Sequence, residues 1–418
     1  MKIPFKRGNI LLPKNTDMTK WSVVACDQYT SEPEYWNSVR EIVGSNPSTL
    51  NLTLPEIYLE ESDVEERIKK INQNMEELVN MDFFNEYSDS MIYLERTQED
   101  GKVREGLMGI VDLEDYSYEK GSQTLIRATE KTVIERIPPR VKVRENALLE
   151  LPHIMILIDD EKKNIIESLK NKVTESDIVY DFDLMKNGGH IKGYLLNNEI
   201  MDEVDERLEC LADKDYFENK YGVKDKGILL FAMGDGNHSL ATAKACYENL
   251  KKEIGEKALS SKSRYALVEL VNLHSDALEF EAINRVIFNT DKDKLLNSLK
   301  EYYTINKEGN GQEFRVVTDS IDEAWYIENP KSNIAVGSIQ MFLDDYLKDN
   351  VGKIDYIHGE DVTKSLASKD NNVGFIFDAM AKEDLFKTVI LDGALPRKTF
   401  SMGHANDKRY YLEARKIK

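Results

Sequence analysis

The chain contains very little cysteine. Of its 418 residues only three are cysteine, Cys26, Cys210 and Cys246, and their spacing matches no metal-ligand pattern. An odd, small number of cysteines does not make a disulfide framework. We therefore expect a reduced, intracellular protein.

Long apolar runs are also missing. The N-terminal stretch MKIPFKRGNILLPKNTD has no apolar core of signal-peptide length. No other run approaches the ~18 apolar residues that a membrane-spanning helix needs. The sequence predicts a cytoplasmic protein with no membrane partner.

Positive charge is in deficit. Lys and Arg number 56 against 76 Asp and Glu, which gives a formal net charge of −20. Nucleic-acid binding depends on Lys and Arg neutralising phosphates, so this balance argues against a nucleic-acid partner.

Several chemical signatures are absent. None of the six histidines stands four residues from another His or from Cys, so a preformed zinc site is not predicted. The chain has no Gly-x-Ser-x-Gly elbow, no Walker loop and no Rossmann fingerprint. These absences argue against an α/β-hydrolase and against a nucleotide site of the Walker or Rossmann type.

The elements that are present alternate between helix and strand. Residues 62–79 predict a helix with Ser62 and Glu65 as a capping box, and residues 198–217 predict one long amphipathic helix. An Asp-Gly turn at 99–102 separates two strand-like runs and predicts a hairpin. This pattern predicts an α+β (mixed α/β) fold. We divide the chain, with soft boundaries, into residues 1–150, 151–290 and 291–418, which could form one or two compact units.

The most informative stretch is GILLFAMGDGNHSLATAKACYENL. An apolar strand, Ile228 to Met233, ends at Gly234-Asp235-Gly236, and a helix is expected to begin at Asn237 or Ser239. Two glycines permit positive φ, so their backbone N–H groups and the helix N-terminus could bind an anion such as phosphate.

Two side chains beside this turn could bind a metal ion or transfer a proton. Asp235 would hold Mg²⁺ or accept a proton, and His238 would donate to a phosphate oxygen or transfer a proton. The alternative is a plain Gly-Asp-Gly turn followed by an Asn or Ser helix cap.

The motif GDGNHSLATA resembles the Asp-Gly-His-His-Arg motif of the domain-of-unknown-function family 1015. LMGIVDLEDY, ATEKT, ALVELVNL, FEAINRVI, IDYIHGEDVTKSL and LPRKTF follow the order of that family, so the resemblance covers nearly the whole chain. The family's motif is similar to the nucleotide-binding element of the ParB and sulfiredoxin superfamily, which includes a free-serine kinase. The resemblance implies a ParB/sulfiredoxin-like core elaborated with additional β-hairpins and helices. It also implies a phosphate pocket at Gly234, Asp235, Gly236, Asn237, His238 and Ser239.

The chain departs from the family pattern at several positions. Asn237 and Ser239 stand where the family has His and Arg, and Thr129 and Asn284 replace frequent histidines. A Ser hydroxyl is a poor substitute for a bidentate Arg. Either the basic segment 127–144 supplies the missing charge, or the ligand carries less charge.

A second constellation is VVACDQYTSEPEYW near the N-terminus. Its place in the chain resembles that of the family's Pro-Tyr-Asp element, and Asp27 after an apolar run is a suitable general base for a substrate hydroxyl. The alternative for Asp27 is a helix cap. Cys26 is a poor nucleophile candidate because its neighbour Asp27 would raise the pKa of the thiol.

Two further pairs match the family. Glu130 and Lys131 correspond to its Glu-Arg/Lys-Thr element and are assigned to nucleotide binding, and Arg397 and Lys398 lie in the LPRKTF match. The alternative for both pairs is a solvated charge run.

Together these features predict a nucleotide-dependent, kinase-like phosphotransferase that acts on a small hydroxylated metabolite, for example an amino acid such as serine. Asp235, His238 and Asp27 are the expected catalytic residues, and the expected cofactors are a nucleoside di- or triphosphate and Mg²⁺ held by Asp235. The alternatives are a nucleotide-binding regulatory module without turnover and a protein whose pocket has lost its activity. The oligomeric state and the choice of nucleotide stay open.

Overall fold

The computed structural model describes residues 2–30, 32–119, 121–132, 134–396, 398–403 and 405–418. The chain forms two compact units, each described here by itself. Unit 1 consists of Met1–Ala128, Thr132–Leu278 and His404–Lys418, and unit 2 of Thr129–Lys131 and Glu279–Gly403. Both combine helices with mainly antiparallel sheets, which confirms the predicted α+β class. The division into three consecutive regions stays a prediction.

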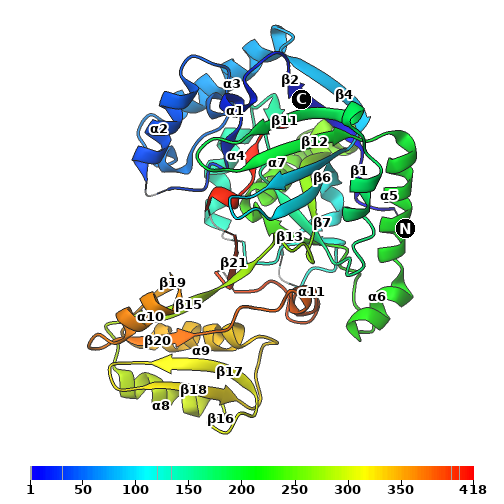
Figure 1. Cartoon of the computed structure of the whole chain (residues 1–418). Helices are drawn as coiled ribbons and strands as arrows, with labels where there is room; N and C mark the ends of the chain where they lie inside the picture. Colours follow the sequence, from blue (N-terminus) through cyan, green and yellow to red (C-terminus); the bar gives the residue numbers. More distant parts are fainter. Residues whose placement is uncertain (1, 31, 120, 133, 397, 404) are drawn as a thin grey trace. The chain divides into compact units, whose positions relative to one another are not determined.

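A ten-stranded sheet organises the described part of unit 1 (Figure 1). The sheet order is β11 (Ile178–Asp183), β12 (His190–Leu195), β5 (Ile92–Thr97), β6 (Val103–Asp112), β14 (Tyr265–Asn272), β10 (Met155–Ile158), β13 (Phe231–Asp235), β8 (Ile126–Arg127) and β7 (Tyr116–Ser117), with β1 (Phe5–Lys6) paired to β6. The pairs β10–β14, β13–β8 and β8–β7 are parallel, and the other pairs are antiparallel. The predicted hairpin is confirmed: β5 and β6 flank a turn in which Gly101 has a φ of 83°.

The strands in the middle of this sheet are buried, which explains why their sequences are almost continuously apolar. Every residue of β10 is buried, as is every residue of β14 after Tyr265. Helix α7 (Asn237–Ile254) follows β13 directly, and α4 (Ile137–Arg144) packs against α7. Strand β13 and α7 thus form the strand-turn-helix unit that the sequence predicts.

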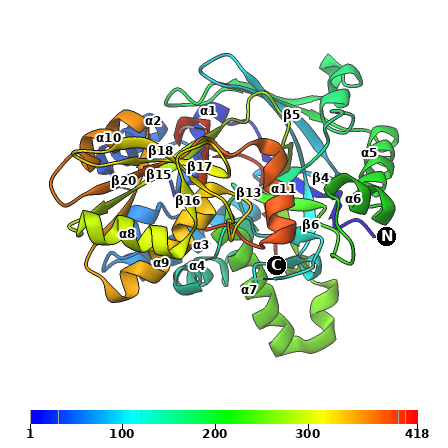
Figure 2. The same cartoon turned by 90° about the horizontal axis from the view of Figure 1, so that it is seen from below.

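Two helix predictions need correction. Residues 198–217 do not form one helix: α5 (Asn198–Leu211) stops, and Asp213 caps a second helix, α6 (Lys214–Tyr221), by accepting from the N–H of Tyr216. Figure 2 shows α5 and α6, in green, as two successive helices. The predicted capping box at Ser62 and Glu65 is also wrong, because α3 (Val64–Asn80) has Asp63 at its N-cap and makes no side-chain cap bond.

Three two-stranded ladders complete unit 1, together with the short helix α1 (Met18–Trp21) and α2 (Pro33–Val43). The ladders are β2 (Gly8–Pro13) with β4 (Phe84–Ser90), β3 (Val23–Val24) with β22 (Tyr410–Tyr411), and β9 (Leu149–Glu150) with β23 (Arg415–Lys416). Near the C-terminus, Tyr410–Tyr411 and Arg415–Lys416 thus form two short strands. Each ties the C-terminal segment to a different part of unit 1.

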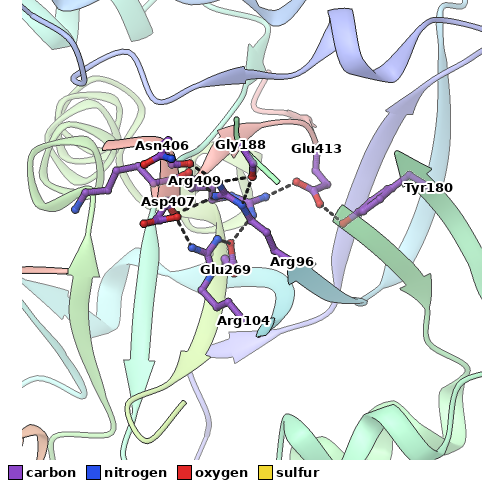
Figure 3. Close-up of polar contacts among 10 residues, drawn as sticks. Arg96, Arg104, Tyr180, Gly188, Glu269, Asn406, Asp407, Arg409 and Glu413 are labelled. Atoms are coloured by element: carbon purple, nitrogen blue, oxygen red, sulfur yellow. Dashed lines mark hydrogen bonds and ion pairs between the residues drawn. The ribbon is translucent and has the colours of Figure 1, made fainter. Parts of the chain in front are cut away.

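Buried arginines fix that C-terminal segment (Figure 3). The Arg96 guanidinium donates to the carbonyl of Gly188 at 2.9 Å and to that of Asp407 at 3.0 Å, and Arg104 donates to the carbonyl of Asp407 at 2.9 Å. The carboxylate of Glu269 accepts from Arg104 at 3.2 Å and from Arg409 at 2.5 Å. Backbone carbonyls of a returning segment thus hydrogen-bond to a buried charge cluster in the sheet.

The same cluster continues along β22. Arg409 pairs with Glu413, which accepts from the hydroxyl of Tyr180 at 2.7 Å (Figure 3). Arg409, Glu413 and Glu269 are essentially inaccessible to solvent. Buried charges of this kind are stable only when paired, so the cluster specifies where residues 406–413 lie.

Unit 2 has a seven-stranded sheet in its described part. The sheet order is β16 (Ile305–Asn306), β18 (Asp322–Ile327), β17 (Gln312–Val317), β20 (Val373–Ile376), β15 (Phe280–Phe288) and β19 (Lys353–His358), with β21 (Phe400–Met402) paired to β15. Helix α8 (Lys292–Tyr302) packs on α9 (Ala335–Asp349), which in turn packs on β17. Helix α10 (Glu360–Ala367) packs on β15 and β20, and α11 (Lys382–Leu391) follows β20 in the chain. No helix in the described part of either unit combines the length and the apolarity that a membrane span requires.

Candidate functional site

The glycine loop joins β13 to α7. Gly236 is the N-cap of α7 in the left-handed conformation, with φ 75° and ψ 28°, and a Cβ placed on it would lie 3.0 Å from the Cα of Ile154. Both facts require glycine at this position. Gly234 instead keeps the extended conformation of β13, so of the two glycines only Gly236 adopts the positive φ that both permit.

The first turn of α7 can receive an anion. Asn237, His238 and Ser239 open this helix, whose first turn contains no acidic residue and whose N-cap offers no side-chain acceptor. The leading N–H groups and the helix dipole favour negative charge at this end. The side-chain oxygen of Asn237 is buried, and no hydrogen-bond partner for it lies among the described residues.

Asp235 is already engaged on both of its oxygens. One oxygen accepts from the backbone N–H of Gly236 at 2.8 Å, and the other lies 3.4 Å from the ammonium of Lys408. Burial alone would raise the pKa of Asp235, but Lys408 and His153 outweigh burial and hold that pKa below its ordinary value. Asp235 is therefore an ionised carboxylate next to a fixed cation.

His153 links Asp27 to the glycine loop. Its Nε2 lies 3.7 Å from a carboxylate oxygen of Asp27 and 3.4 Å from the hydroxyl of Ser239. Its Nδ1 lies 3.1 Å from the hydroxyl of Tyr411, which accepts from the backbone N–H of Cys26 at 3.0 Å. The structure thus brings together two segments, around residue 27 and around residue 237, that the sequence analysis treats as separate candidates.

Neither His153 nor Lys408 is among the residues predicted from the sequence. His153 stands just before β10, whose residue Met155 is paired with Asp235 of β13, so its position follows from strand pairing. Lys408 precedes β22, and the backbone N–H of Ala25 donates to the carbonyl of Arg409 at 2.9 Å. Asp27 follows β3 and Lys408 precedes β22, so the antiparallel pairing of these two strands places both residues at the same end of the ladder. No motif of neighbouring residues could have predicted this.

The environment of His238 is positive. Burial first, and then the guanidinium groups of Arg140 and Arg136, lower the pKa of His238 to about 4, while Asp27 acts in the opposite direction. The imidazole is therefore neutral at pH 7 and can donate one hydrogen bond but adds no charge. Two arginines of the basic segment 127–144 are close enough to the loop to act on its histidine.

Cys26 is unsuited to nucleophilic attack. Burial, and secondarily the carboxylate of Asp27, raise the pKa of the thiol to about 12. The thiol stays protonated at physiological pH, as the neighbouring carboxylate predicts.

The remaining candidates belong to both units. Arg127 is buried and donates to the carbonyls of Thr124 at 2.8 Å and Gly227 at 2.6 Å, so it fixes the approach to β13. Glu130 and Lys131 belong to unit 2, where the N–H of Lys131 donates to the carbonyl of Leu395 at 3.0 Å, and their role in nucleotide binding stays a prediction. Lys398 also belongs to unit 2, and Arg397 lies outside the described residues.

A cavity of about 150 Å³ adjoins the loop within unit 1. Ser239 and Thr242, one turn apart on α7, form part of its wall together with His153, Cys26 and Tyr411. The rest of the lining is mainly apolar and comprises Leu52, Thr53, Leu54, Glu56, Leu59, Met75, Arg140, Val143, Arg144, Ala147, Leu149, Glu150, Leu151, Pro152 and Ile154. The site therefore combines a helix terminus that can receive an anion, the partly exposed carboxylate of Asp27 and a space for a small molecule.

A separate group, Asp159, Glu161 and His274, has ligand atoms within 4.8 Å of one another. The ammonium of Lys220 lies 3.0 Å from Asp159 and 3.4 Å from Glu161, so a cation is already supplied by the chain. We interpret this group as an ion-pair cluster.

Comparison with known proteins gives a family match and weak structural similarities. A family model described as "Protein of unknown function (DUF1015)" matches residues 4–346. No curated protein sequence matches the chain. Similar solved structures include a mutant free serine kinase in complex with ADP, with a TM-score of 0.39 and 10% identity over 76% of this chain and 93% of that chain.

Two more structures complete the comparison. A free serine kinase in complex with AMP has a TM-score of 0.38 and 10% identity over 74% of this chain and 90% of that chain. SbnI with a C-terminal truncation from Staphylococcus aureus has a TM-score of 0.36 and 8% identity over 71% and 82%. At these TM-scores the similarity carries no conclusion about the activity of this chain.

Proposed function

The chain belongs to the DUF1015 family, and we propose that it is a nucleotide-dependent phosphotransferase that acts on the hydroxyl group of a small metabolite. One observation carries the proposal: His153 Nε2 lies between the carboxylate of Asp27 and the hydroxyl of Ser239, at 3.7 Å and 3.4 Å. A candidate base and the N-terminus of α7 therefore meet at His153, which lines the small cavity.

The nucleotide phosphates would bind at the start of α7. Backbone N–H groups of Asn237 and Ser239 supply neutral donors. The cations near the loop are Lys408, which also pairs with Asp235, and Arg140, which also pairs with Glu56. This arrangement supports the expectation that other residues compensate for the Arg that Ser239 replaces. Cations placed around a transferred phosphoryl group stabilise the charge that develops on its oxygens.

Asp27 is the better candidate for the base. Both oxygens of Asp235 are engaged by Gly236 and Lys408, whereas the side chain of Asp27 is 30% exposed and accepts from Gln28 on one oxygen at 3.1 Å. In the proposed step the substrate oxygen forms a bond to the terminal phosphorus, the bond from that phosphorus to the nucleoside diphosphate breaks, and Asp27 takes the hydroxyl proton. Asp235 would then orient Lys408.

The predicted Mg²⁺ would neutralise phosphate charge when bound, because Mg²⁺ is typically held by one or two carboxylates and by phosphate oxygens. Asp235 can contribute a carboxylate oxygen only if Lys408 shares it. Its role as a metal ligand stays a prediction.

A regulatory module that binds nucleotide without turnover is the second candidate. Asn237 and Ser239 favour it, because they replace the His and Arg of the family motif. In such a module the helix terminus would still bind phosphate, while Asp27 would have no chemical role.

Asp27→Asn separates these candidates. Thermal unfolding is measured with ATP, ADP, CTP and GTP, with and without Mg²⁺, and phosphoryl transfer is measured against a panel of hydroxylated metabolites. A nucleotide at about a hundredfold excess over its Kd should stabilise the wild type by about 2.7 kcal/mol. For the phosphotransferase, Asp27→Asn keeps this shift and loses turnover. Nucleotide binding without turnover on any metabolite in the wild type supports the module instead, and no shift with any nucleotide contradicts both.

A further inference from the structure

The cavity next to His153 has a lining whose charges are already neutralised. The guanidinium of Arg140 contacts the carboxylate of Glu56, and Arg144 lies 2.5 Å from Glu150. Glu150 also pairs with Arg415 at 2.5 Å and accepts from the N–H of Leu267 at 2.9 Å. Each carboxylate of the lining therefore has a cation of the chain as its partner.

The hydroxyl groups of the lining are also engaged. Thr53 donates to the carbonyl of Thr49 at 2.8 Å, and Thr242 donates to the carbonyl of His238 at 2.7 Å. The hydroxyls of Ser239 and Tyr411, which also line the cavity, both contact His153.

The remainder of the wall is aliphatic. Leu52, Leu54, Leu149, Leu151 and Ile154 are all buried. A cavity of about 150 Å³ with such walls is large enough for a molecule the size of benzene. An ammonium group placed against these aliphatic side chains would lose part of its hydration without gaining a charged partner there.

Resting on the proposed function, we infer that the phosphoryl acceptor is an alcohol with an uncharged, mainly apolar body of about the size of a benzene ring. Its hydroxyl would point toward His153 and Asp27, and its body would occupy the space beside Leu52, Leu149 and Ile154. A free amino acid such as serine fits the apolar part of this wall poorly, because the carboxylates that line the cavity, Glu56 and Glu150, are already paired with arginines. The inference concerns which acceptor is used, whereas the proposed function concerns whether nucleotide binds and transfers phosphate.

The test compares 2-phenylethanol and 3-methyl-1-butanol with L-serine and glycerol. Binding of each to the full chain is measured by calorimetry, with and without ATP and Mg²⁺, and phosphorylated product is measured in parallel. Leu59→Trp fills the cavity from a partly buried position in its wall. Leu78→Trp is the matched control, since Leu78 is partly buried against the same core but does not line the cavity.

We expect an apolar alcohol to bind the wild type and Leu78→Trp, and to bind Leu59→Trp at least about tenfold more weakly, a loss of about 1.4 kcal/mol. Binding or phosphorylation of L-serine in preference to the alcohols would overturn the inference, as would binding of none of the four compounds. If Leu59→Trp loses ATP instead and no alcohol binds, the cavity holds the nucleotide base and the inference is wrong. Alcohol binding without any nucleotide binding would leave the cavity assignment intact and contradict the proposed function alone.

Discussion

Lys408 places its ammonium nitrogen 3.4 Å from a carboxylate oxygen of Asp235, although the two residues lie in different parts of the chain. Lys408 is held there because the carbonyls on either side of it, at Asp407 and Arg409, accept hydrogen bonds from Arg104 and from the backbone of Ala25. Its side chain is only 15% exposed. The chain thus supplies a fixed cation at the loop where the family motif has an Arg and this sequence has Ser239.

Lys408→Ala should weaken nucleotide binding. The variant removes a charged hydrogen-bond donor worth about 1.5–3 kcal/mol, which corresponds to a loss of about 10–100-fold in affinity. Titration of ATP by calorimetry gives the change, and Lys408→Arg should retain most of the affinity because it keeps the charge. Equal affinity of Lys408→Ala and the wild type would remove Lys408 from the site.

Gly236→Ala tests the loop conformation. A side chain in the left-handed region costs about 1–2 kcal/mol, and at Gly236, where φ is 75°, its Cβ would also approach the Cα of Ile154 to 3.0 Å. Gly222 is the matched control, since it has a φ of 65° and no heavy atom lies within 4 Å of the position that a Cβ would occupy there. We expect Gly236→Ala to lower the free energy of unfolding more than Gly222→Ala does, measured by urea denaturation, and to reduce nucleotide binding. Similar losses in the two variants would contradict the steric argument.

Local patterns predicted the strand, the glycine turn and the start of α7, because each depends on residues close in sequence. The Asp-Gly hairpin between β5 and β6 was predictable for the same reason. The break between α5 and α6 at Asp213 was missed because the apolar periodicity continues across it. The roles of His153 and Lys408 could not be predicted from the sequence, because their positions depend on strand pairings between segments far apart in the chain.

The buried charge cluster makes the site depend on residues remote from it. Glu269 neutralises Arg104 and Arg409, and these two arginines hold the pKa of Glu269 below its ordinary value against the opposing effect of burial. Sequence alone places Glu269 in an apolar strand, where a carboxylate has no evident partner. The partner becomes visible only when the C-terminal segment is placed.

Glu269→Gln should therefore destabilise unit 1. Removing one partner of a buried pair costs about 3–5 kcal/mol because it leaves uncompensated charge. Here Arg104 loses the carboxylate of Glu269, and Arg409 keeps Glu413 but loses Glu269. Glu86→Gln is the control, since Glu86 pairs with Lys416 at 2.8 Å on the surface, where such a pair contributes about 0–1 kcal/mol. Urea denaturation measures both variants, and a Glu269→Gln loss no larger than that of Glu86→Gln would show that the cluster is not needed for stability.

The titration of His238 gives a test in solution. Burial and the nearby Arg140 and Arg136 lower its pKa from 6.5 to about 4, so between these values the unfolded chain binds a proton at this residue and the folded chain does not. The free energy of unfolding should therefore fall as pH falls from about 6.5 toward about 4, and part of that fall should be absent in His238→Gln. NMR titration of the imidazole measures the pKa directly. Addition of a nucleotide should raise this pKa, because phosphate brings negative charge to the helix terminus. If the pKa of His238 is instead near 6.5 and does not change with nucleotide, His238 lies outside a positive, phosphate-binding site.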